Sequence, residues 1–548
     1  MCLKSVRITV CRVGAFMGGA RFLIVDALAT ERGARRFTRD VIGAGPRTVA
    51  GMLEQLGFEC RICPAERVFA DESFLLHFDV LMCSGMSMDV PSMRRVVRSW
   101  RRVKEDGIAI AGGPAAADPY MLFGRTDYDL AVISECEMTL KELLDEGLSK
   151  GLLPEREALE GIRGLAFKTD GGVVMTGLRP PVFEFRFEPS VERIADYPYF
   201  RVSRVYVTCV RGCSNYRRTL LTLPDGRKCS GCGLCSGDDL AKRYYCPVGI
   251  PPGCGFCSVP SLFGPPRSRS KNSILREISG LLERGVRRIV LGASDFLDYE
   301  REKLVNPNPL TDPCFPEPNY SEMESLLSEV SEIQKAEKEK TYISIENIKP
   351  CLFTDEAARI ISTYLPNTTV HIGCETGSEA HSRKIGRPST PGESLSAVRR
   401  AVAHGLRPYV YFIHGLPGQT MKSARETVRL MDRMADCGVE KVTIYRFRPL
   451  PMSAFGDFES PPPATKERAS RMIFEKAKQI NLERKRDLVG KIVEAIVAEK
   501  LHSGVYVAYP LREGPTIILD AEEAPVNDLV RVKITRVKSD KLVEGVLD

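Results

Sequence analysis

The stretch Cys246-Pro-Val-Gly-Ile-Pro-Pro-Gly-Cys-Gly-Phe-Cys257 decides the fold class of this chain. Cys254 and Cys257 form a C-x2-C pair, and Cys246 lies upstream with seven residues between it and the pair. An iron–sulfur cluster normally takes four cysteine ligands, so three thiolates leave one iron open, as catalysis at a metal requires. A structural zinc site is the plainer interpretation of a C-x2-C pair considered alone. The segments that follow the loop favour the first interpretation.

Five segments in chain order resemble the radical S-adenosylmethionine (SAM) superfamily. They are Cys254-Gly-Phe-Cys-Ser-Val-Pro-Ser-Leu-Phe-Gly264, Leu291-Gly-Ala-Ser-Asp-Phe296, Ser344-Ile-Glu-Asn-Ile348, Ile372-Gly-Cys-Glu-Thr-Gly-Ser378 and Tyr411-Phe-Ile-His-Gly-Leu-Pro-Gly-Gln-Thr420. One such match would be weak evidence, but five in the family's order make the resemblance specific.

This resemblance implies a partial (β/α) barrel and a 4Fe-4S cluster whose open iron binds the amino and carboxylate groups of SAM. An electron, from a donor such as ferredoxin or flavodoxin, would then cleave SAM to methionine and a 5′-deoxyadenosyl radical. The resemblance implies Cys246, Cys254 and Cys257 as catalytic cluster ligands. It places cofactor contacts at Phe256, Gly292, Ser294, Asp295, Glu346, Glu375, Ser378, Gly415 and Leu416.

A cysteine-rich insertion, residues 213–246, leaves two ligand sets open. Cys229, Cys232 and Cys235 have the C-x2-C-x2-C spacing of ferredoxins, and either Cys213 or Cys246 could complete their site. The favoured assignment gives Cys246 to the SAM cluster and Cys213 to the second site, because a compact loop fixes its ligands at a lower entropic cost. The alternative exchanges these two cysteines. The second site could hold zinc or an auxiliary 4Fe-4S cluster.

The first 150 residues alternate strand-like and helix-like segments, which predicts a doubly wound, Rossmann-like parallel sheet. The segments Gly112-Gly-Pro-Ala-Ala-Ala-Asp-Pro119 and Ser134-Glu-Cys-Glu-Met-Thr-Leu-Lys-Glu-Leu-Leu144 resemble the cobalamin-binding-like domain that precedes many radical SAM cores. The cobalt-ligating Asp-x-His-x-x-Gly pattern of many such domains does not occur in the sequence. Whether cobalamin binds therefore stays open, and a retained fold without cobalamin is the plainer interpretation.

The rest of the chain divides at changes of composition and periodicity. Residues 151–200 read as a connector, 201–460 as the radical SAM barrel, and 461–486 as a helical linker. Five short alternating segments in 487–548 predict a small β-barrel of the OB kind. The stretch Asp528-Leu-Val-Arg-Val-Lys-Ile-Thr-Arg536 resembles the TRAM domain, an RNA-binding barrel. This resemblance implies phosphate contacts by Arg531, Lys533 and Arg536. An ordinary solvated face is the alternative. The expected fold class is thus α/β with a small C-terminal β-barrel.

Composition narrows the class of protein. The 548 residues are 43% apolar and 27% charged, with a net charge of +7, which permits a polyanionic partner without requiring one. The sequence has no apolar run long enough to span a membrane and no recognisable signal peptide. Eight of the 18 cysteines lie in 209–257, which indicates metal binding in a reducing cytoplasm rather than disulfides.

Together these features predict a cytoplasmic radical SAM enzyme that modifies RNA, with tRNA as the favoured substrate. The order of barrel and TRAM-like domain resembles tRNA methylthiotransferases, whose N-terminal domain carries three cysteines. The N-terminal segment of this chain has a C-x2-C pair, Cys60 and Cys63, but its sequence does not otherwise resemble that family. Methylthiolation and methylation therefore both stay open. The alternatives are an enzyme acting on a protein or small molecule, and a non-catalytic RNA-binding iron–sulfur protein. The sequence carries no signal for an oligomeric state.

Overall fold

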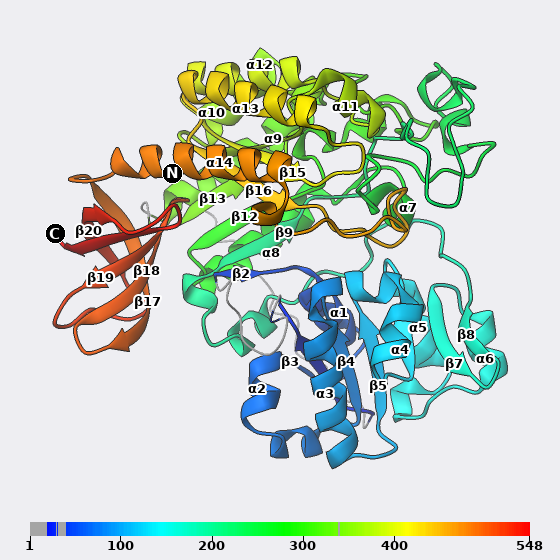
Figure 1. Ribbon diagram of the computed structural model, residues 1–548. Coiled ribbons are helices and arrows are strands. Elements are labelled where there is room, and N and C mark those ends of the chain that lie inside the picture. Colours follow the sequence, from blue (N-terminus) through cyan, green and yellow to red (C-terminus); the bar gives the residue numbers. More distant parts are fainter. Residues whose placement is uncertain (1–18, 29, 31–39, 183, 338–339) are drawn as a thin grey trace, which may run out of the picture.

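The computed structural model describes residues 19–548 except 29, 31–39, 183 and 338–339 (Figure 1). Three parts follow one another: a sheet flanked by helices, a central partial barrel, and a small closed β-barrel at the C-terminus. This confirms the expected α/β class with its small C-terminal barrel.

The N-terminal part is a seven-stranded sheet whose first five strands in sheet order are parallel. Residues of β1 alternate between the two faces: Phe22 and Ile24 pack with helix α1, and Leu23 and Val25 pack with helix α3. Helices on both faces confirm the doubly wound arrangement. The bounds, in sheet order and then for the helices, are β3 (Cys60–Pro64), β1 (Phe22–Asp26), β4 (Val80–Ser84), β5 (Ile108–Gly112), β6 (Leu130–Val132), β7 (Leu165–Thr169), β8 (Gly172–Met175), α1 (Gly45–Gln55), α3 (Val90–Val103), α4 (Pro119–Arg125) and α5 (Glu137–Asp145).

Strand pairings cross the boundary that we expected at residue 150 in both directions. The hairpin β7–β8, which we expected in a connector, extends the N-terminal sheet with antiparallel pairing to β6. In the other direction, the short strand β2 (Val41–Ile42) leaves that sheet and pairs with β9 of the central barrel. The two parts are therefore interlocked, and one continuous apolar core runs through both of them.

The central part consists of six consecutive parallel strands that curve into a partial barrel. A single bridge between Ile348 and Ile372 joins its two sheets. The strands are β9 (Arg204–Thr208), β12 (Arg288–Gly292), β13 (Tyr342–Ile345), β14 (Thr369–Glu375), β15 (Arg407–His414) and β16 (Lys441–Arg446). Its helices are α8 (Lys271–Glu283), α9 (Tyr320–Ala336), α10 (Asp355–Tyr364), α11 (Glu379–Lys384), α12 (Pro391–Ala403) and α13 (Met421–Asp436).

The two faces of these strands differ in chemistry, because successive side chains alternate along a strand. One set of positions packs into the apolar core beneath the helices, namely Val205, Ile289, Ile343, Ile372, Val410 and Val442. The alternate positions carry polar and aromatic side chains to the inner face, among them Tyr206, Glu346, His371, Tyr411 and Tyr445. An active site built on this fold would use the inner face at the carboxyl ends of the strands.

The C-terminal part begins with helix α14 (Arg468–Arg486), which lies in the segment where we expected a helical linker and packs against the core. Its residues Ile473 and Ile480 join the main apolar core, and Asn481 makes two hydrogen bonds to the backbone of Val442. The closed barrel that follows has the expected five strands. In barrel order they are β17 (Ile492–His502), β18 (Val505–Pro510), β19 (Thr516–Asp520), β21 (Leu542–Leu547) and β20 (Leu529–Val537).

Two further findings concern the whole chain. Within the described residues, no helix has both the length and the apolar character needed to cross a bilayer. Cys314 and Cys351 form a disulfide between the loop before α9 and the segment after β13. The sequence analysis, which favoured free and metal-binding thiols, did not anticipate this bond.

Candidate functional site

Three thiols lie together where the cluster loop meets the core. Cys213 follows the short strand β10 (Val210–Arg211), whose pairing with β11 (Arg267–Ser268) fixes the end of that segment. The side-chain amide of Asn215 donates to Cys254 Sγ at 3.2 Å, and its backbone N–H lies 3.5 Å from Cys213 Sγ. Burial and the neighbouring Cys254 and Cys213 thiols raise the pKa of Cys257 to about 12. Cys213, Cys254 and Cys257 therefore lie close enough for the charge of one thiolate to affect the others.

The position of Cys246 favours the alternative ligand assignment, in which Cys213 rather than Cys246 serves the SAM cluster. Cys246 and Cys235 lie near Arg218, where both raise the pKa of the guanidinium against the lowering effect of burial. Cys246 also packs with Cys229 against a small apolar cluster around Ile250. The structure thus groups Cys246 with the ferredoxin-type cysteines and Cys213 with the C-x2-C pair. Because β10 pairs with β11, the segment before Cys213 is already fixed, so this distant cysteine joins the pair at a low entropic cost.

The three thiols fit a cluster by the chemistry around them. Two side chains, Asn215 and Arg387, donate hydrogen bonds to the sulfur of Cys254 and can orient it toward a metal. Burial raises the pKa of Cys213 to about 11, so this thiol is protonated at neutral pH until a metal replaces the proton. Within the described ranges, no group of three or more His, Cys, Asp or Glu side chains already stands in a metal-binding arrangement.

Arg387 is a site residue that the sequence analysis missed. Its Nη1 atom lies 3.4 Å from Cys254 Sγ and 3.7 Å from Glu375 Oε1, and Nη2 donates to the carbonyl oxygen of Gly373. One guanidinium therefore spans the cluster loop and the end of β14. The Gly386-Arg387-Pro388 turn after α11 was the available signal, but a single arginine has no specificity in a sequence.

Three expected cofactor contacts meet at the carboxyl ends of the inner strands. Gly292 ends β12, and a Cβ at this position would lie 3.2 Å from the ring of Tyr206, so glycine keeps that space free. Glu346 follows β13, with its Oε1 3.8 Å from His371 Nδ1. Glu375 ends β14 at a register shift and has a left-handed φ of 67°. Burial, opposed by Arg387, raises the pKa of its carboxyl.

Asp295 is placed differently from the expectation. Its carboxylate is fully buried, lies 3.0 Å from Lys349 Nζ, and accepts from the backbone of Leu297 and Lys349. Asp298, also buried, lies 2.6 Å from the same Nζ. Burial alone would raise the pKa of Asp298, but Lys349 and Arg301 outweigh it and hold the pKa below its ordinary value. Asp295 therefore holds the loop behind the site, while its neighbour Ser294 is partly exposed.

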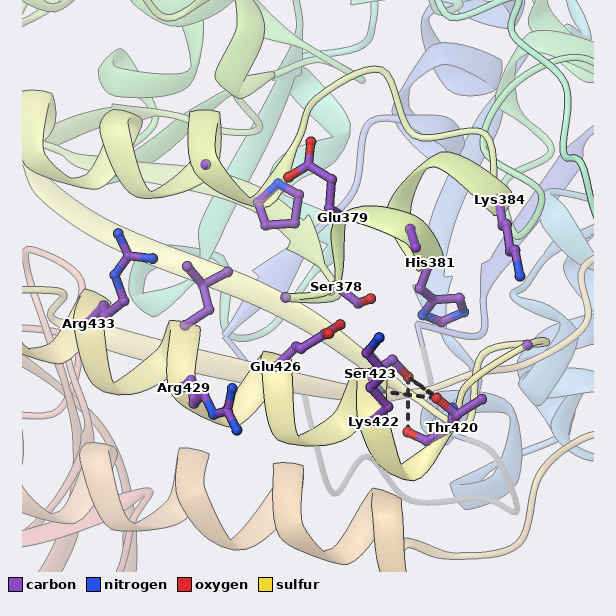
Figure 2. Close-up of a pocket in the computed structure, with 16 residues that line it drawn as sticks. Ser378, Glu379, His381, Lys384, Thr420, Lys422, Ser423, Glu426, Arg429 and Arg433 are labelled. Carbon is purple, nitrogen blue, oxygen red and sulfur yellow. Dashed lines mark hydrogen bonds between the residues drawn. The ribbon is translucent and has the colours of Figure 1, made fainter.

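Ser378 lies apart from the inner face. It lines a pocket of about 660 Å³ bounded by α11, α12 and α13, shown with Glu426 and Thr420 in Figure 2. Gly377 beside it is required by packing, because a Cβ there would lie 2.4 Å from Cα of Thr427. The structure therefore does not bring Ser378 together with Gly292, Glu346 and Glu375.

The other expected contacts border a small apolar cluster. Leu416 is buried in it with Ile250 and Phe455, and Phe256 packs against its edge. Gly415 has a φ of 74°, and a Cβ there would lie 2.5 Å from Pro461. The cluster joins the C-x2-C loop to the turn after β15.

The closed barrel docks on the amino ends of the core strands. Glu513, in the loop between β18 and β19, is 7% exposed; its carboxylate lies 3.3 Å from Arg204 Nη1 and 3.4 Å from His371 Nε2. Arg407 donates to the Glu513 carbonyl oxygen at 2.6 Å. Burial would raise the pKa of Glu513, but His371, Arg204 and Lys441 outweigh it and hold that pKa well below its ordinary range.

The expected basic residues of β20 share an exposed face. Arg531 and Lys533 are exposed on alternate positions, and a register shift after Ile534 keeps Arg536 exposed as well. Two carboxylates meet this face: Asp548 lies 2.9 Å from Arg531, and Glu544 lies 2.6 Å from Arg536. The face is therefore basic but partly neutralised.

Known proteins match both the core and the whole chain. A model of the Radical SAM superfamily matches residues 244–431. The uncharacterized protein MK0932 of Methanopyrus kandleri is 43% identical over 529 residues, 95% of this chain and 95% of that protein. The tRNA-2-methylthio-N(6)-dimethylallyladenosine synthase of Thermus thermophilus is 26% identical over 51% of this chain and 57% of its own length. The ribosomal protein uS12 methylthiotransferase RimO of Methylorubrum populi is 24% identical over 54% and 68%, respectively.

Among solved structures, TsrM from Kitasatospora setae, a radical SAM methyltransferase with cobalamin and a [4Fe-4S] cluster bound, is similar at a TM-score of 0.56. The alignment has 16% identity and covers 80% of this chain and 74% of that chain, so the likeness concerns the fold. The chain belongs to the same family as the Methanopyrus kandleri protein, and it is built around a radical SAM domain.

Proposed function

We propose that this radical SAM enzyme modifies RNA, with tRNA as the favoured substrate. The observation that carries the proposal is the basic face of β20, with Arg531 and Lys533 exposed, on a closed barrel that is fixed to the core through Glu513. Lysine and arginine side chains that neutralise phosphates supply most of the affinity in nucleic-acid binding. The methylthiotransferase relative that acts on tRNA supports this choice of polyanion.

In this proposal Cys213, Cys254 and Cys257 would hold a 4Fe-4S cluster, which would supply the electron that cleaves SAM. Asn215 and Arg387 donate to Cys254 and orient its sulfur. Glu346 and Glu375 lie at the strand ends where carboxylates can accept hydrogen bonds from the bound cofactor. Lys349 neutralises the buried carboxylates behind the loop.

A second metal site is proposed at Cys229, Cys232, Cys235 and Cys246. Their spacing suits zinc or an auxiliary 4Fe-4S cluster, and Cys229 and Cys246 share one apolar cluster. An auxiliary cluster would favour methylthiolation, whereas zinc would favour a structural role for the insertion. Iron and zinc analysis of a variant lacking Cys254 separates the two sites.

Cobalamin is a separate question that concerns the N-terminal sheet. The carboxyl edge of this sheet faces the core, because Glu135 pairs with Arg267 at 2.8 Å and Ser134 donates to the Leu262 carbonyl oxygen. A Cβ on Gly112 at the end of β5 would meet open space, whereas one on Gly113 would lie 2.9 Å from the Gly85 carbonyl oxygen. The space beside Gly112 is the support that this edge gives to a corrinoid. Methylation would use such a cofactor, and absorbance of protein reconstituted with hydroxocobalamin tests for it.

The RNA proposal is tested by binding unmodified tRNA transcripts to the wild type and to the double variant Arg531→Glu/Lys533→Glu. We expect the variant to lose affinity, and the slope of log affinity against log salt to fall by about one for each lost phosphate contact. Lys150→Glu, an exposed charge reversal in the N-terminal part, is the matched control. Equal binding by the double variant and the wild type would reject this face as the RNA site.

A further inference from the structure

We propose that Tyr445 and Tyr411 form a stacking platform that receives a planar ring of the substrate, a nucleobase, at the open end of the radical SAM barrel. The inference rests on the RNA substrate proposed above and names where one of its bases would bind. In the sequence, Tyr411 begins one of the family-like segments without a role of its own, and Tyr445 lies outside them.

The two rings are already arranged as a stack. Tyr411 lies on β15 and Tyr445 on β16, where the register pairs Tyr411 with Thr443 and Ile413 with Tyr445. Their ring centroids are 5.8 Å apart and their planes differ by 4°. Diagonal neighbours on adjacent strands are within reach of aromatic side chains, so the strand pairing itself positions the stack.

Both rings lie on the inner face of the barrel. On the same strands, Val410, Phe412 and Val442 occupy the alternate positions and are buried in the core beneath the helices. Because side chains alternate along a strand, Tyr411 and Tyr445 point the other way, toward the inner face.

Tyr411 is held in place by its neighbours, whereas Tyr445 is accessible. The Tyr411 hydroxyl lies 2.7 Å from His371 Nδ1, and His371 in turn stacks on Tyr409 at 5.4 Å and contacts Glu513. Tyr445 is 54% exposed although it belongs to a strand of the core. Because Tyr445 already stacks on a fixed ring and its other face is open, it loses little conformational entropy when a second ring stacks on it.

The platform lies beside the strand ends that carry the expected cofactor contacts. Burial raises the pKa of Tyr445, and the carboxylates of Glu346 and Glu375 raise it further, so both carboxylates are neighbours of this ring. A base stacked on Tyr445 would present its edge to these acceptors. Exocyclic amines and ring N–H groups of nucleobases are the matching donors.

A nucleobase suits this arrangement better than an aliphatic side chain. Every base has a π-face, so stacking on an aromatic residue is tolerant of sequence and contributes strongly to single-stranded binding. Enzymes that act on a base take it out of the helical stack into a site with aromatic walls and polar edges. Tyr445 would supply the wall, with Glu346 and Glu375 at the edge.

The test measures the KM for a pool of unmodified tRNA transcripts and, separately, the Kd for SAM and the RNA-free formation of 5′-deoxyadenosine. We expect Tyr445→Ala to raise the KM for tRNA about tenfold, while Tyr445→Phe restores it because the ring is retained. The SAM Kd and the RNA-free rate should change several-fold less than the KM for tRNA. Tyr120→Ala, an exposed tyrosine on α4 of the N-terminal part, is the matched control.

The outcomes separate the two proposals. If wild-type protein binds no tRNA, the RNA function fails, and the nucleobase platform fails with it. If wild type binds tRNA but Tyr445→Ala leaves its KM unchanged, only the platform is overturned. If Tyr445→Ala weakens SAM as much as tRNA, the ring contacts the cofactor, and the platform is likewise rejected. Circular dichroism of each variant confirms that these results come from folded protein.

Discussion

Arg387 donates a hydrogen bond to the thiol of Cys254, with Nη1 3.4 Å from Sγ. The same guanidinium reaches Glu375 and the Gly373 carbonyl oxygen, so the cluster loop is tied to the end of β14 by one side chain. An arginine in this position fixes the direction of the Cys254 sulfur and places a positive charge beside the cluster loop.

Replacing this arginine should therefore weaken the cluster. We expect Arg387→Met to retain the fold but to bind less iron after anaerobic reconstitution and to form at least tenfold less 5′-deoxyadenosine. Arg383→Met, an exposed arginine on α11, should match wild type in both measurements. Full iron content with unchanged SAM cleavage in Arg387→Met would remove this residue from the site.

The grouping of thiols gives a prediction that separates the two ligand sets. Cys213 lies with Cys254 and Cys257, whereas Cys246 lies with the ferredoxin-type cysteines. Cys213→Ala should therefore abolish SAM cleavage, and Cys246→Ala should retain it while losing metal from the second site. The reverse pattern would restore the assignment that the sequence alone favoured. Metal analysis beside 5′-deoxyadenosine measurement reads out both sites in the same samples.

Glu513 should stabilise the docking of the C-terminal barrel. Removing one partner from a buried ionic cluster typically costs about 3–5 kcal/mol, so Glu513→Gln should lower the free energy of unfolding by an amount in that range. Because the pKa of Glu513 is depressed in the folded state, its contribution is complete above the ordinary pKa of a glutamate and is lost as the pH falls below it.

Denaturant unfolding of Glu513→Gln and wild type across acidic pH measures this contribution. The exposed Glu523→Gln is the control, since it changes the same charge in the following loop. A difference between Glu513→Gln and wild type that stays constant down to pH about 2 would contradict the ionic role of Glu513.

Glu302 should oppose folding as the pH rises. Burial raises its pKa to about 7, although it accepts hydrogen bonds from the Ser268 backbone N–H at 2.7 Å and from the Ser268 hydroxyl at 3.1 Å. A raised carboxyl pKa means that the folded state holds a proton which the unfolded state releases, so wild type loses stability between the two pKa values.

Glu302→Gln should lack this loss, because a glutamine carries no titrating proton. Relative to wild type, its free energy of unfolding should rise between pH 5 and pH 7, by at most about 3 kcal/mol. Glu332→Gln, an exposed change on α9, should show no such trend. Parallel curves for Glu302→Gln and wild type across this range would show that Glu302 ionises normally.

Local periodicity predicted most of the architecture. The five strands of the C-terminal barrel, and the alternating strands and helices of the first two parts, follow from the spacing of apolar residues. Apolar residues recur at every second position in a strand and at every third or fourth position in a helix. The interlocking of the parts was not predictable in this way. The strand β2 has two residues, and only its pairing with β9 reveals where it belongs.

The family motifs indicated where several candidate site residues lie along the strands, but not the tertiary contacts that these residues make. Glu346 and Gly292 come to the inner strand ends as the motif order implied. The family resemblance of residues 291–296 implied a cofactor contact at Asp295, but its carboxylate lies 3.0 Å from Lys349, which is distant in sequence. Arg387 and Tyr445 lie outside the family-like motifs of the sequence. Only their contacts in the fold, with Cys254 and with Tyr411 respectively, indicate a role.

The most direct test of the account is electron paramagnetic resonance of reduced, anaerobically reconstituted protein before and after SAM is added, in wild type and in Cys213→Ala. Three thiolates that leave one iron open predict a 4Fe-4S signal in wild type that changes shape with SAM, and no SAM-dependent change in Cys213→Ala. A wild-type signal indifferent to SAM, or an unaltered response in Cys213→Ala, would contradict the central claim.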